Sequence, residues 1–420
     1  MKQKTALILT ALVLVLAALA CQLPWQTTTP TPTDEVTPTE ATTEPPVVTE
    51  TETATEPPTA TATEEPTPAL PVVANPEIFN FKFFTPTRGW GATQNGNMIL
   101  VTVDGGQTWL DATPPAVALP PTSSATLSLS PFYLDENTAW VSPGNFGSGS
   151  GMIYHTQDGG VSWSETTTPF DNARYFFLDA TAGYAIVDLG AGAGSQYVAI
   201  YQTTDGGVNW TQVFTHVPGE SMSLPESGHK AGITFLDLNH GWIGGDIPMT
   251  DHFYLYLTAD GGATWAEETD ITLPAEYSGS FLSVWQPIFV GGTVGYLPVR
   301  VLTASSDSFL LIYRTDDGGQ TWVFQGAVSG QVQANGGVDF YAPDSGWIAA
   351  GTSLYHSTDN GLNWSPVAGS GIPASENLLK VSFVDADHGW VLGTPDTNTW
   401  TPLNFYRTTD GGASWTQLLP

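Results

Sequence analysis

The phrase "YRTTDGGASWTQ", residues 406–417, stands close to the C-terminal end of this 420-residue chain and recurs with small changes elsewhere. Three other copies are "YQTTDGGVNWTQ" at residues 201–212, "YRTDDGGQTWVF" at 313–324 and "YHSTDNGLNWSP" at 355–366. A repeated acidic phrase of this kind has three interpretations: a catalytic signature, a metal-binding loop or a structural turn. The residues that stay constant between the copies decide among them.

The constant residues are an aspartate, a Thr or Ser two positions before it, a Gly two positions after it and a Trp five positions after it. This pattern occurs seven times, at intervals of 42 to 57 residues, which are typical of propeller blades. The aspartates are Asp104, Asp158, Asp205, Asp260, Asp317, Asp359 and Asp410, and the tryptophans are Trp109, Trp163, Trp210, Trp265, Trp322, Trp364 and Trp415.

A second phrase alternates with the first and consists of two aromatic residues separated by six others. It also occurs seven times, and Gly precedes its second aromatic residue in six copies, whereas Ala139 does so in the other. The two phrases together define seven repeat units. The aromatic pairs are Phe83/Trp90, Tyr133/Trp140, Phe177/Tyr184, Phe235/Trp242, Phe289/Tyr296, Phe340/Trp347 and Phe383/Trp390.

Each repeat unit divides into four short segments that are rich in β-branched and aromatic residues. In the fourth unit they are "AGITFLDL" (231–238), "GWIGG" (241–245), "FYLYLT" (253–258) and "ATWAEE" (263–268). No stretch of the repeats has a helical period. The sequence therefore predicts an all-β fold, a seven-bladed β-propeller of four-stranded blades over residues 75–420.

The chemistry of the first phrase indicates a structural turn. Its carboxylate can accept backbone N–H groups across a tight turn, as can the Thr hydroxyl, and its Gly tolerates a positive φ. A calcium loop is the alternative suggested by "TDDGGQ", but the alternating carboxylates and the distal Glu that calcium needs are missing. We therefore predict an Asp-box hairpin in every blade, with no metal and no cofactor.

This phrase resembles the Asp box, also called the bacterial neuraminidase repeat. The closer resemblance is to the photosystem II stability/assembly factor-like propellers, which combine both phrases. Here "FVDADHGW" (383–390) with "TTDGGASW" (408–415), and "FLDLNHGW" (235–242) with "TADGGATW" (258–265), match that combination. The resemblance covers about residues 76–420 and implies a non-catalytic binding or assembly propeller. The photosynthetic members of that family share an Arg-rich face, and the five scattered Arg of this chain do not form one. The resemblance therefore does not imply a role in photosynthesis.

Sialidases carry the same hairpins but need three arginines that converge on the substrate. Only Arg174 and Arg300 are expected to face the central pocket, so a sialidase is not favoured.

The residue type three positions before each aspartate varies freely, so His155, Arg314, His356 and Arg407 are predicted to be strand residues and not ligands. A glycoside hydrolase with a different Asp/Glu pair stays as the alternative to a binding propeller. A purely architectural envelope component is a third interpretation.

The N-terminal segment predicts export from the cytoplasm. Lys2 and Lys4 precede an apolar run that ends in "LAALAC", so residues 1–20 resemble a bacterial lipoprotein signal with Cys21, the sole cysteine, as the lipidated residue. That family prefers Leu where Ala18 stands, and an uncleaved anchor or ordinary secretion are the alternatives. All three predict a cell-surface, extracellular or periplasmic location.

Residues 21–74 are rich in Thr, Pro and Glu, with nine acidic and no basic side chains, and predict a disordered tether. The whole chain carries 41 Asp and Glu against 10 Lys and Arg, a net charge of -31. So few basic residues exclude a nucleic-acid partner and disfavour contact with an anionic membrane surface, apart from the lipid anchor.

The binding site is expected on the loops at the face opposite the Asp boxes. These loops carry aromatic rings and carboxylates, which suit a sugar or a peptide, although long loops of an acidic protein also carry such residues by chance. We predict a lipid-anchored, monomeric, non-catalytic propeller that binds an extracellular protein or glycan. The candidate ligand residues are Glu220, Glu226, His229, Asp246, Asp251, His252, Tyr277, Trp285, Arg300 and Trp400.

Overall fold

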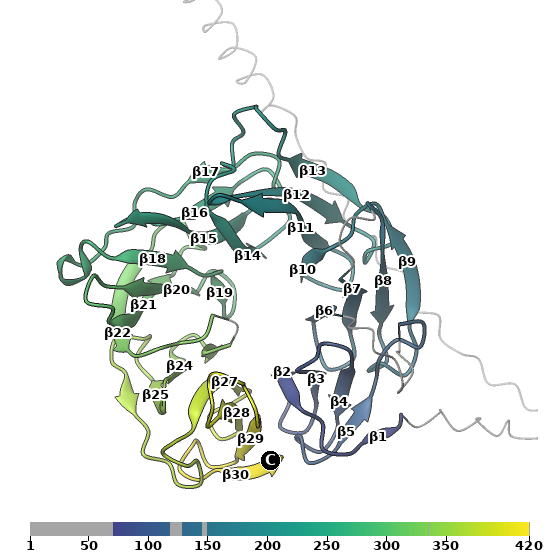
Figure 1. The fold of residues 1–420 in the computed structure, drawn as a ribbon, viewed down its shortest axis with the longest axis vertical. Coiled ribbons are helices and arrows are strands. Elements are labelled where there is room, and N and C mark those ends of the chain that lie inside the picture. The colour runs from purple at the N-terminus through teal and green to yellow at the C-terminus, as the bar shows by residue number, and fades with distance from the viewer. Residues whose placement is uncertain (1–69, 118–127, 145–148, 335, 420) are drawn as a thin grey trace, which may run out of the picture. The chain divides into compact units, whose positions relative to one another are not determined.

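The computed structural model describes residues 70–117, 128–144, 149–334 and 336–419, so Cys21, the signal and nearly all of the tether lie outside the described residues. Residues Pro66–Pro420 form one compact unit, in which antiparallel sheets follow one another around a central opening (Figure 1). The all-β prediction is confirmed, since the described helical structure is a single short 3-10 helix, η1 (Ala275–Tyr277). Within the described residues, no helix has the length and apolar character needed to cross a membrane.

Most repeat units form a sheet of their own, built from strands that are consecutive in the chain. The first sheet holds β1 (Val72–Val73), β2 (Ile78–Phe83), β3 (Gly89–Thr93), β4 (Ile99–Thr102) and β5 (Trp109–Asp111). The second holds β6 (Leu129–Tyr133), β7 (Ala139–Pro143), β8 (Gly151–Thr156) and β9 (Ser164–Thr168). The third holds β10 (Ala173–Phe177), β11 (Gly183–Gly192), β12 (Ser195–Thr203) and β13 (Thr211–Thr215).

The fourth and fifth units share one nine-stranded sheet, because β15 pairs with β18. Its strands are β14 (His229–Phe235), β15 (Gly241–Thr250), β16 (Leu255–Thr258), β17 (Ala266–Glu267), β18 (Phe281–Val284), β19 (Ile288–Phe289), β20 (Gly295–Leu302), β21 (Ser308–Thr315) and β22 (Val323–Ser329). The sixth unit holds β23 (Val338–Ala342), β24 (Ser345–Ala350), β25 (Ser353–Ser357) and β26 (Ser365–Pro366), and the seventh β27 (Asn377–Phe383), β28 (Gly389–Thr394), β29 (Asn404–Thr408) and β30 (Thr416–Leu419).

Two details differ from the prediction. Strand β1 lies inside the predicted tether, which is therefore wrong at residues 72–73: Val72 and Val73 pair with Leu110 and Trp109 on the outer edge of the first sheet. The fifth unit has its inner strand split into β18 and β19, both of which pair with β20. The first and last sheets take no strand from each other, so side chains join the two ends of the described chain.

The second phrase provides the contact between neighbouring units. The second aromatic ring of each unit packs on the first aromatic ring of the next unit, and in six of the seven cases the two ring planes lie within 10° of parallel. The last unit makes the same contact with the first. The centroid distances are 5.4 Å for Trp90–Tyr133, 3.6 Å for Trp140–Phe177, 3.4 Å for Tyr184–Phe235, 5.1 Å for Trp242–Phe289, 3.6 Å for Tyr296–Phe340, 4.0 Å for Trp347–Phe383 and 3.6 Å for Trp390–Phe83.

The other face of several of these rings is covered by the residue three positions before the aspartate. His155 stacks on Trp140 at 4.6 Å and His356 on Trp347 at 4.1 Å, while the Arg407 guanidinium lies 5.8 Å from the Trp390 ring. These side chains are therefore packing partners within a unit, as strand residues should be.

The seven aspartates of the first phrase have the same hydrogen bonds. In each turn one carboxylate oxygen accepts the hydroxyl of the preceding Thr or Ser at 2.7–2.9 Å and the backbone N–H four residues later at 2.8–2.9 Å. The second oxygen accepts the side chain four residues later at 2.5–2.7 Å. The Gly two residues after the aspartate has a φ of 80° to 93°, a conformation that favours glycine.

Hydrogen bonding should make the protein sensitive to acid. The pKa of each of these seven carboxyls is lowered, and at Asp410 the largest cause is the Ser414 hydroxyl. A carboxyl whose pKa is lower in the folded than in the unfolded state stabilises the fold above its unfolded pKa and loses that effect as the pH falls through its folded pKa. As these seven carboxyls become protonated, we expect the free energy of unfolding to fall below about pH 4. Urea titrations on either side of this pH check this, and stability that rises toward pH 3 would contradict it.

The glycine before the second aromatic residue is explained by the pairing of the first two strands of a unit. Phe340 pairs directly with Gly346, and a Cβ at Gly346 would lie 2.4 Å from the Phe340 ring. We therefore expect Gly346→Ala to lower the free energy of unfolding by about 1–3 kcal/mol. The matched control is Ala139→Gly, which removes a tolerated methyl group and should cost only about 0.5–1 kcal/mol through chain entropy. Equal stabilities of G346A and the natural protein in urea unfolding would refute this explanation.

Candidate functional site

Strand β15 reaches the predicted binding face because it runs away from the Asp turns. Its first residue, Gly241, pairs with Thr258, the hydroxyl residue of an Asp turn, whereas its last residue, Thr250, pairs with Phe281 of β18. Residues 246–250 therefore lie at the end of the sheet opposite the turns, beside the fifth unit.

Three of the predicted ligand residues gather at this place. His229 pairs with Asp246 across β14 and β15, with 3.6 Å between Nδ1 and Oδ2, and Arg300 of β20 lines the same cavity of about 350 Å³ as Asp246. We call this cavity the β18 groove and define it by Asp246, Pro248, Phe281, Arg300 and Leu302. It lies at the seam between the fourth and fifth units.

The β18 groove combines apolar exposure with a charged group. Phe281 is 47% exposed, and Met249, between Pro248 and the end of β15, is 54% exposed. Arg300 donates one long hydrogen bond, 3.5 Å from Nη2 to Gln331 Oε1, and its buried Nε has no partner in the described part of the chain. This guanidinium is therefore available to a further acceptor.

Other predicted residues shape the loops around the groove. Asp251 has a φ of 60° and accepts the backbone N–H of Gly279 at 2.6 Å, so its carboxylate holds the loop 272–285. Tyr277 packs edge-on against Phe309 with 5.3 Å between centroids, and His252 Nδ1 lies 3.7 Å from Glu267. Glu220 and Glu226 are exposed in the loop 217–230 and line none of the cavities described here.

The two tryptophans proposed as ligand platforms do not lie in the β18 groove. Trp285 is only 4% exposed and packs in the core with Tyr296 and Phe340, so the prediction of an exposed ring is wrong; the inner strand breaks at this point and turns the indole inward. Trp400 is half-buried, packs edge-on against Phe79 at 6.2 Å and lines a separate cavity near the first and last units.

A second region was missed, the inner wall of the central opening. In every unit the residue just before the first aromatic residue is the β-sheet partner of the second aromatic residue. In six units this residue belongs to a continuous inner strand, and in the fifth unit it belongs to the short strand β19. All seven such residues line two adjoining cavities of about 480 and 390 Å³. They are Lys82, Phe132, Phe176, Thr234, Ile288, Asp339 and Ser382.

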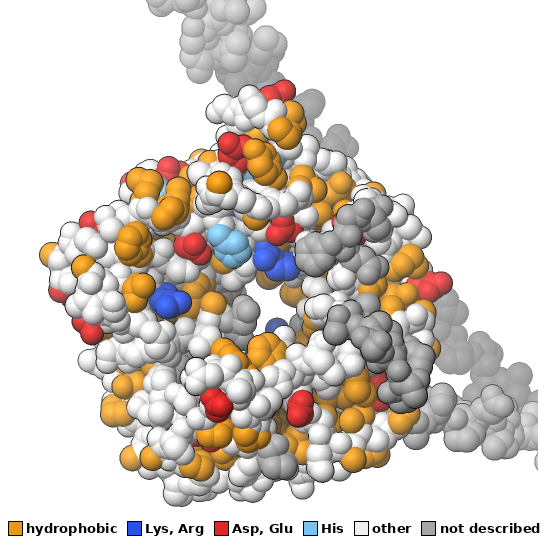
Figure 2. Space-filling model, in the orientation of Figure 1, with side chains coloured by type: hydrophobic (Ala, Val, Ile, Leu, Met, Phe, Trp, Pro, Cys, Tyr) orange, Lys and Arg blue, Asp and Glu red, His pale blue; other side chains and the backbone are white. Residues whose placement is uncertain are grey.

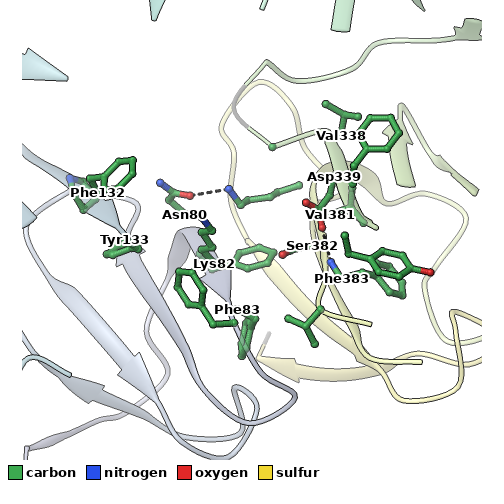
Figure 3. Close-up of a pocket in the computed structure, with 18 residues that line it drawn as sticks. Asn80, Lys82, Phe83, Phe132, Tyr133, Val338, Asp339, Val381, Ser382 and Phe383 are labelled. Carbon is green, nitrogen blue, oxygen red and sulfur yellow. Dashed lines mark hydrogen bonds between the residues drawn. The ribbon is translucent and has the colours of Figure 1, made fainter. Parts of the chain in front are cut away.

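The larger of the two cavities is lined by two lysines, Lys82 and Lys380, and by one aspartate, Asp339 (Figure 3). Lys380 Nζ donates to Asn80 Oδ1 at 2.9 Å, and Asp339 accepts the Phe383 N–H at 2.7 Å. Confinement by the surrounding protein is the main cause that raises the pKa of Asp339 to about 6 and lowers that of Lys380 to about 8. The same cause lowers the pKa of Lys82, whose side chain is still exposed to solvent in the opening.

The candidate ligand residues predicted from the sequence do not include Lys82 and Lys380, which line the larger of these two cavities. Their distance from the first aromatic residue was a usable signal. Strand alternation places residues one and three positions before that buried ring on the inner surface. Figure 2 shows basic side chains around and within the central opening of this otherwise acidic unit.

No group of three or more His, Cys, Asp or Glu among the described residues is arranged to hold a metal ion. Lys230 instead acts as an internal cation beside the β18 groove. Its side chain is fully buried, and Nζ lies 2.9–3.2 Å from the backbone carbonyls of Gln196, Glu226, Ser227 and Gly228. The ammonium thus ties the loop 217–230 to β12.

Replacing Lys230 tests this structural role. Lys230→Met keeps the length of the side chain but leaves several buried carbonyls without a donor, so we expect a loss of about 2–4 kcal/mol in the free energy of unfolding. The neighbouring variant His229→Gln removes an exposed pair and should change it by less than about 1 kcal/mol. Thermal and urea melts of both variants decide the point; a K230M protein as stable as H229Q would show that the carbonyl cluster does not depend on the ammonium.

Comparison with known proteins agrees with the repeated phrases. Residues 60–224 match the family model described as Photosynthesis system II assembly factor YCF48. A photosystem II assembly lipoprotein Ycf48 from Prochlorococcus marinus is 27% identical over 169 residues, which are 33% of this chain and 47% of that protein. A xyloglucanase from a Paenibacillus species is 26% identical over 195 residues, 39% of this chain and 18% of the enzyme. The matched part thus spans less than half the length of each relative.

Among solved structures, YCF48 from Cyanidioschyzon merolae superposes with a TM-score of 0.48 and 18% sequence identity, covering 81% of this chain and 97% of that one. The resemblance predicted from the two phrases is confirmed by the family match and the curated relative. The matched part of the chain is thus similar to the Ycf48-like propellers of the bacterial neuraminidase repeat type.

Proposed function

We propose that this protein is a non-catalytic propeller that binds a protein partner in an assembly or scaffold role. The observation that carries the proposal is the β18 groove, where the exposed Phe281 lies with an Arg300 guanidinium whose Nε has no partner among the described residues. Met249, which follows Pro248 of the groove, is exposed as well. Aromatic residues, Met and Arg are enriched in protein interfaces and dominate their binding energy. Sequence similarity to assembly factors supports the same role.

We also propose that the ring is a seven-bladed propeller with one Asp-box hairpin in each blade. The seven aromatic contacts between units and the seven identical sets of aspartate hydrogen bonds support this count. The lipid anchor on Cys21, the acidic tether and the location outside the cytoplasm remain parts of the proposal. They are supported by the sequence of the N-terminal segment and by a relative that is itself named a lipoprotein.

Glycoside hydrolysis is the second candidate, because part of the chain is similar to a xyloglucanase. Hydrolysis of this kind uses two carboxyl groups about 5–9.5 Å apart. The cavities described above have at most one carboxylate each among their described lining residues, Asp339 or Asp246. This arrangement favours binding over hydrolysis, with an extracellular glycan as the alternative ligand.

Site-specific photo-crosslinking in the full-length protein on its own cells tests the proposal. A photoreactive phenylalanine analogue at Phe281 should give a covalent adduct with one protein species. The same analogue at Val208, an apolar residue within an Asp turn that is 57% exposed, should not give this adduct. Arg300→Ala should reduce the adduct at Phe281 at least about fivefold, because a hot-spot guanidinium contributes more than 1 kcal/mol.

Two outcomes would contradict the proposal. Equal adducts from positions 281 and 208 would show that the groove has no preferred partner. Hydrolysis of a polysaccharide such as xyloglucan by the full-length protein would make it an enzyme, and Asp339 of the inner wall would then be the first residue to replace.

A further inference from the structure

The Lys82 ammonium is the starting point, because it has no hydrogen-bond or ion-pair partner among the described residues. It lines the larger central cavity from β2, and its Nζ lies 4.9 Å from the centroid of the Phe84 ring. A solvent-accessible cation in a cavity, with no protein group paired to it, is available to an incoming anionic group.

A second cation stands in the same cavity. Lys380 of β27 is held toward the cavity by Asn80, and it is close enough to Lys82 that the two repel. Asp339 of β23 acts on both lysines electrostatically but does not form an ion pair within 4.0 Å with either. The cavity therefore contains two cationic groups and one anionic group.

The remaining wall of the opening includes several apolar side chains. Pro131 and Phe132 also line the larger cavity, and Phe176 and Ile288 line the adjoining one. A volume of about 480 Å³ is in the usual range for a small-molecule site. The chemistry that fits this wall and these cations is one carboxylate attached to an apolar body.

We propose that the central cavity binds such a carboxylate, from a small molecule or from the end of a peptide chain, between Lys82 and Lys380, and that Asp339 competes with it for the two lysines. An extended polyanion does not fit, because the net charge of -31 repels it before it reaches the opening. This site is separate from the β18 groove, so either proposal can fail without the other.

Competition by Asp339 gives the site a defined pH dependence. The charged groups that face Asp339 are Lys380 of β27 and Lys82 of β2. Its β-sheet partner on β24 is the uncharged Trp347. The other titratable residues that line the cavity are Tyr133 and Tyr341. Because the pKa of Asp339 is about 6, this carboxyl is neutral below that pH and no longer opposes the ligand. Because the pKa of Lys380 is about 8, binding weakens again above that pH.

Calorimetry with the full-length protein tests the site, with N-acetylphenylalanine and its uncharged amide as one pair of probes. An octapeptide ending in phenylalanine, with and without C-terminal amidation, is the second pair. We expect at least one free carboxylate to bind, its amide to bind at least tenfold more weakly, and its affinity to rise roughly tenfold from about pH 7.5 to pH 5. Binding of only the small acid identifies a small-molecule site, and binding of only the peptide identifies a chain-end site; either result supports the proposal.

Variants make the test specific. Lys82→Met should lower the affinity at least tenfold, while Arg88→Met, which removes an exposed cation outside the cavity, should leave it unchanged. Asp339→Asn keeps an acceptor for the Phe383 N–H and should bind as tightly at about pH 7 as at pH 5. Melting curves of each variant establish that it is folded. The proposal is overturned if the acids and their amides bind with the same affinity or if none of them binds. It is also overturned if the affinity of D339N for the acid still rises as the pH falls to 5.

Discussion

The stacked aromatic contact between neighbouring units is the interaction on which the rest of this structure depends. A single four-stranded unit exposes apolar faces on both sides and is too small to be stable alone. Stacking the second aromatic ring of one unit on the first ring of the next covers both faces at one point. The last unit makes this contact with the first, with 3.6 Å between the ring centroids of Trp390 and Phe83. The ring of repeat units therefore leaves neither of its two ends uncovered at this contact. The indole of Trp390 also donates to Gly105 O at 2.9 Å, so the closing contact is anchored by a hydrogen bond.

This contact also fixes where function can reside. It sets the register of each inner strand, because the first aromatic ring must face its neighbour and the residue just before it must then face the central opening. Those inner positions bear little of the packing and are chemically diverse, from Lys82 and Asp339 to Phe132 and Ile288. The turns at the other end of the strands are uniform, since each repeats the same carboxylate hydrogen bonds. Variation therefore concentrates in the opening and on the face away from the turns, where the β18 groove lies.

The sequence alone predicts the fold well because its two phrases carry the forces that build it. An aspartate, a glycine with positive φ and a tryptophan are needed in every turn, and two aromatic rings are needed in every contact, so spacing reveals both. The site depends on forces that leave no repeated pattern. Trp285 is buried because the inner strand of the fifth unit breaks in two, which its composition does not indicate. The Lys230 ammonium donates hydrogen bonds to four carbonyls from two segments, an arrangement that requires the folded chain.

A double-mutant cycle between Phe83 and Trp390 would test the central claim most directly, with a cycle between Trp140 and Phe177 as the reference. Urea unfolding of the single and double alanine variants gives the coupling free energy of each pair. If the ring closes through the same contact that joins its inner units, both couplings should be about 0.5–1.5 kcal/mol and agree within about 0.5 kcal/mol. A coupling near zero for Phe83 and Trp390, beside a normal value for the reference pair, would show that the two ends of the ring are held together in another way.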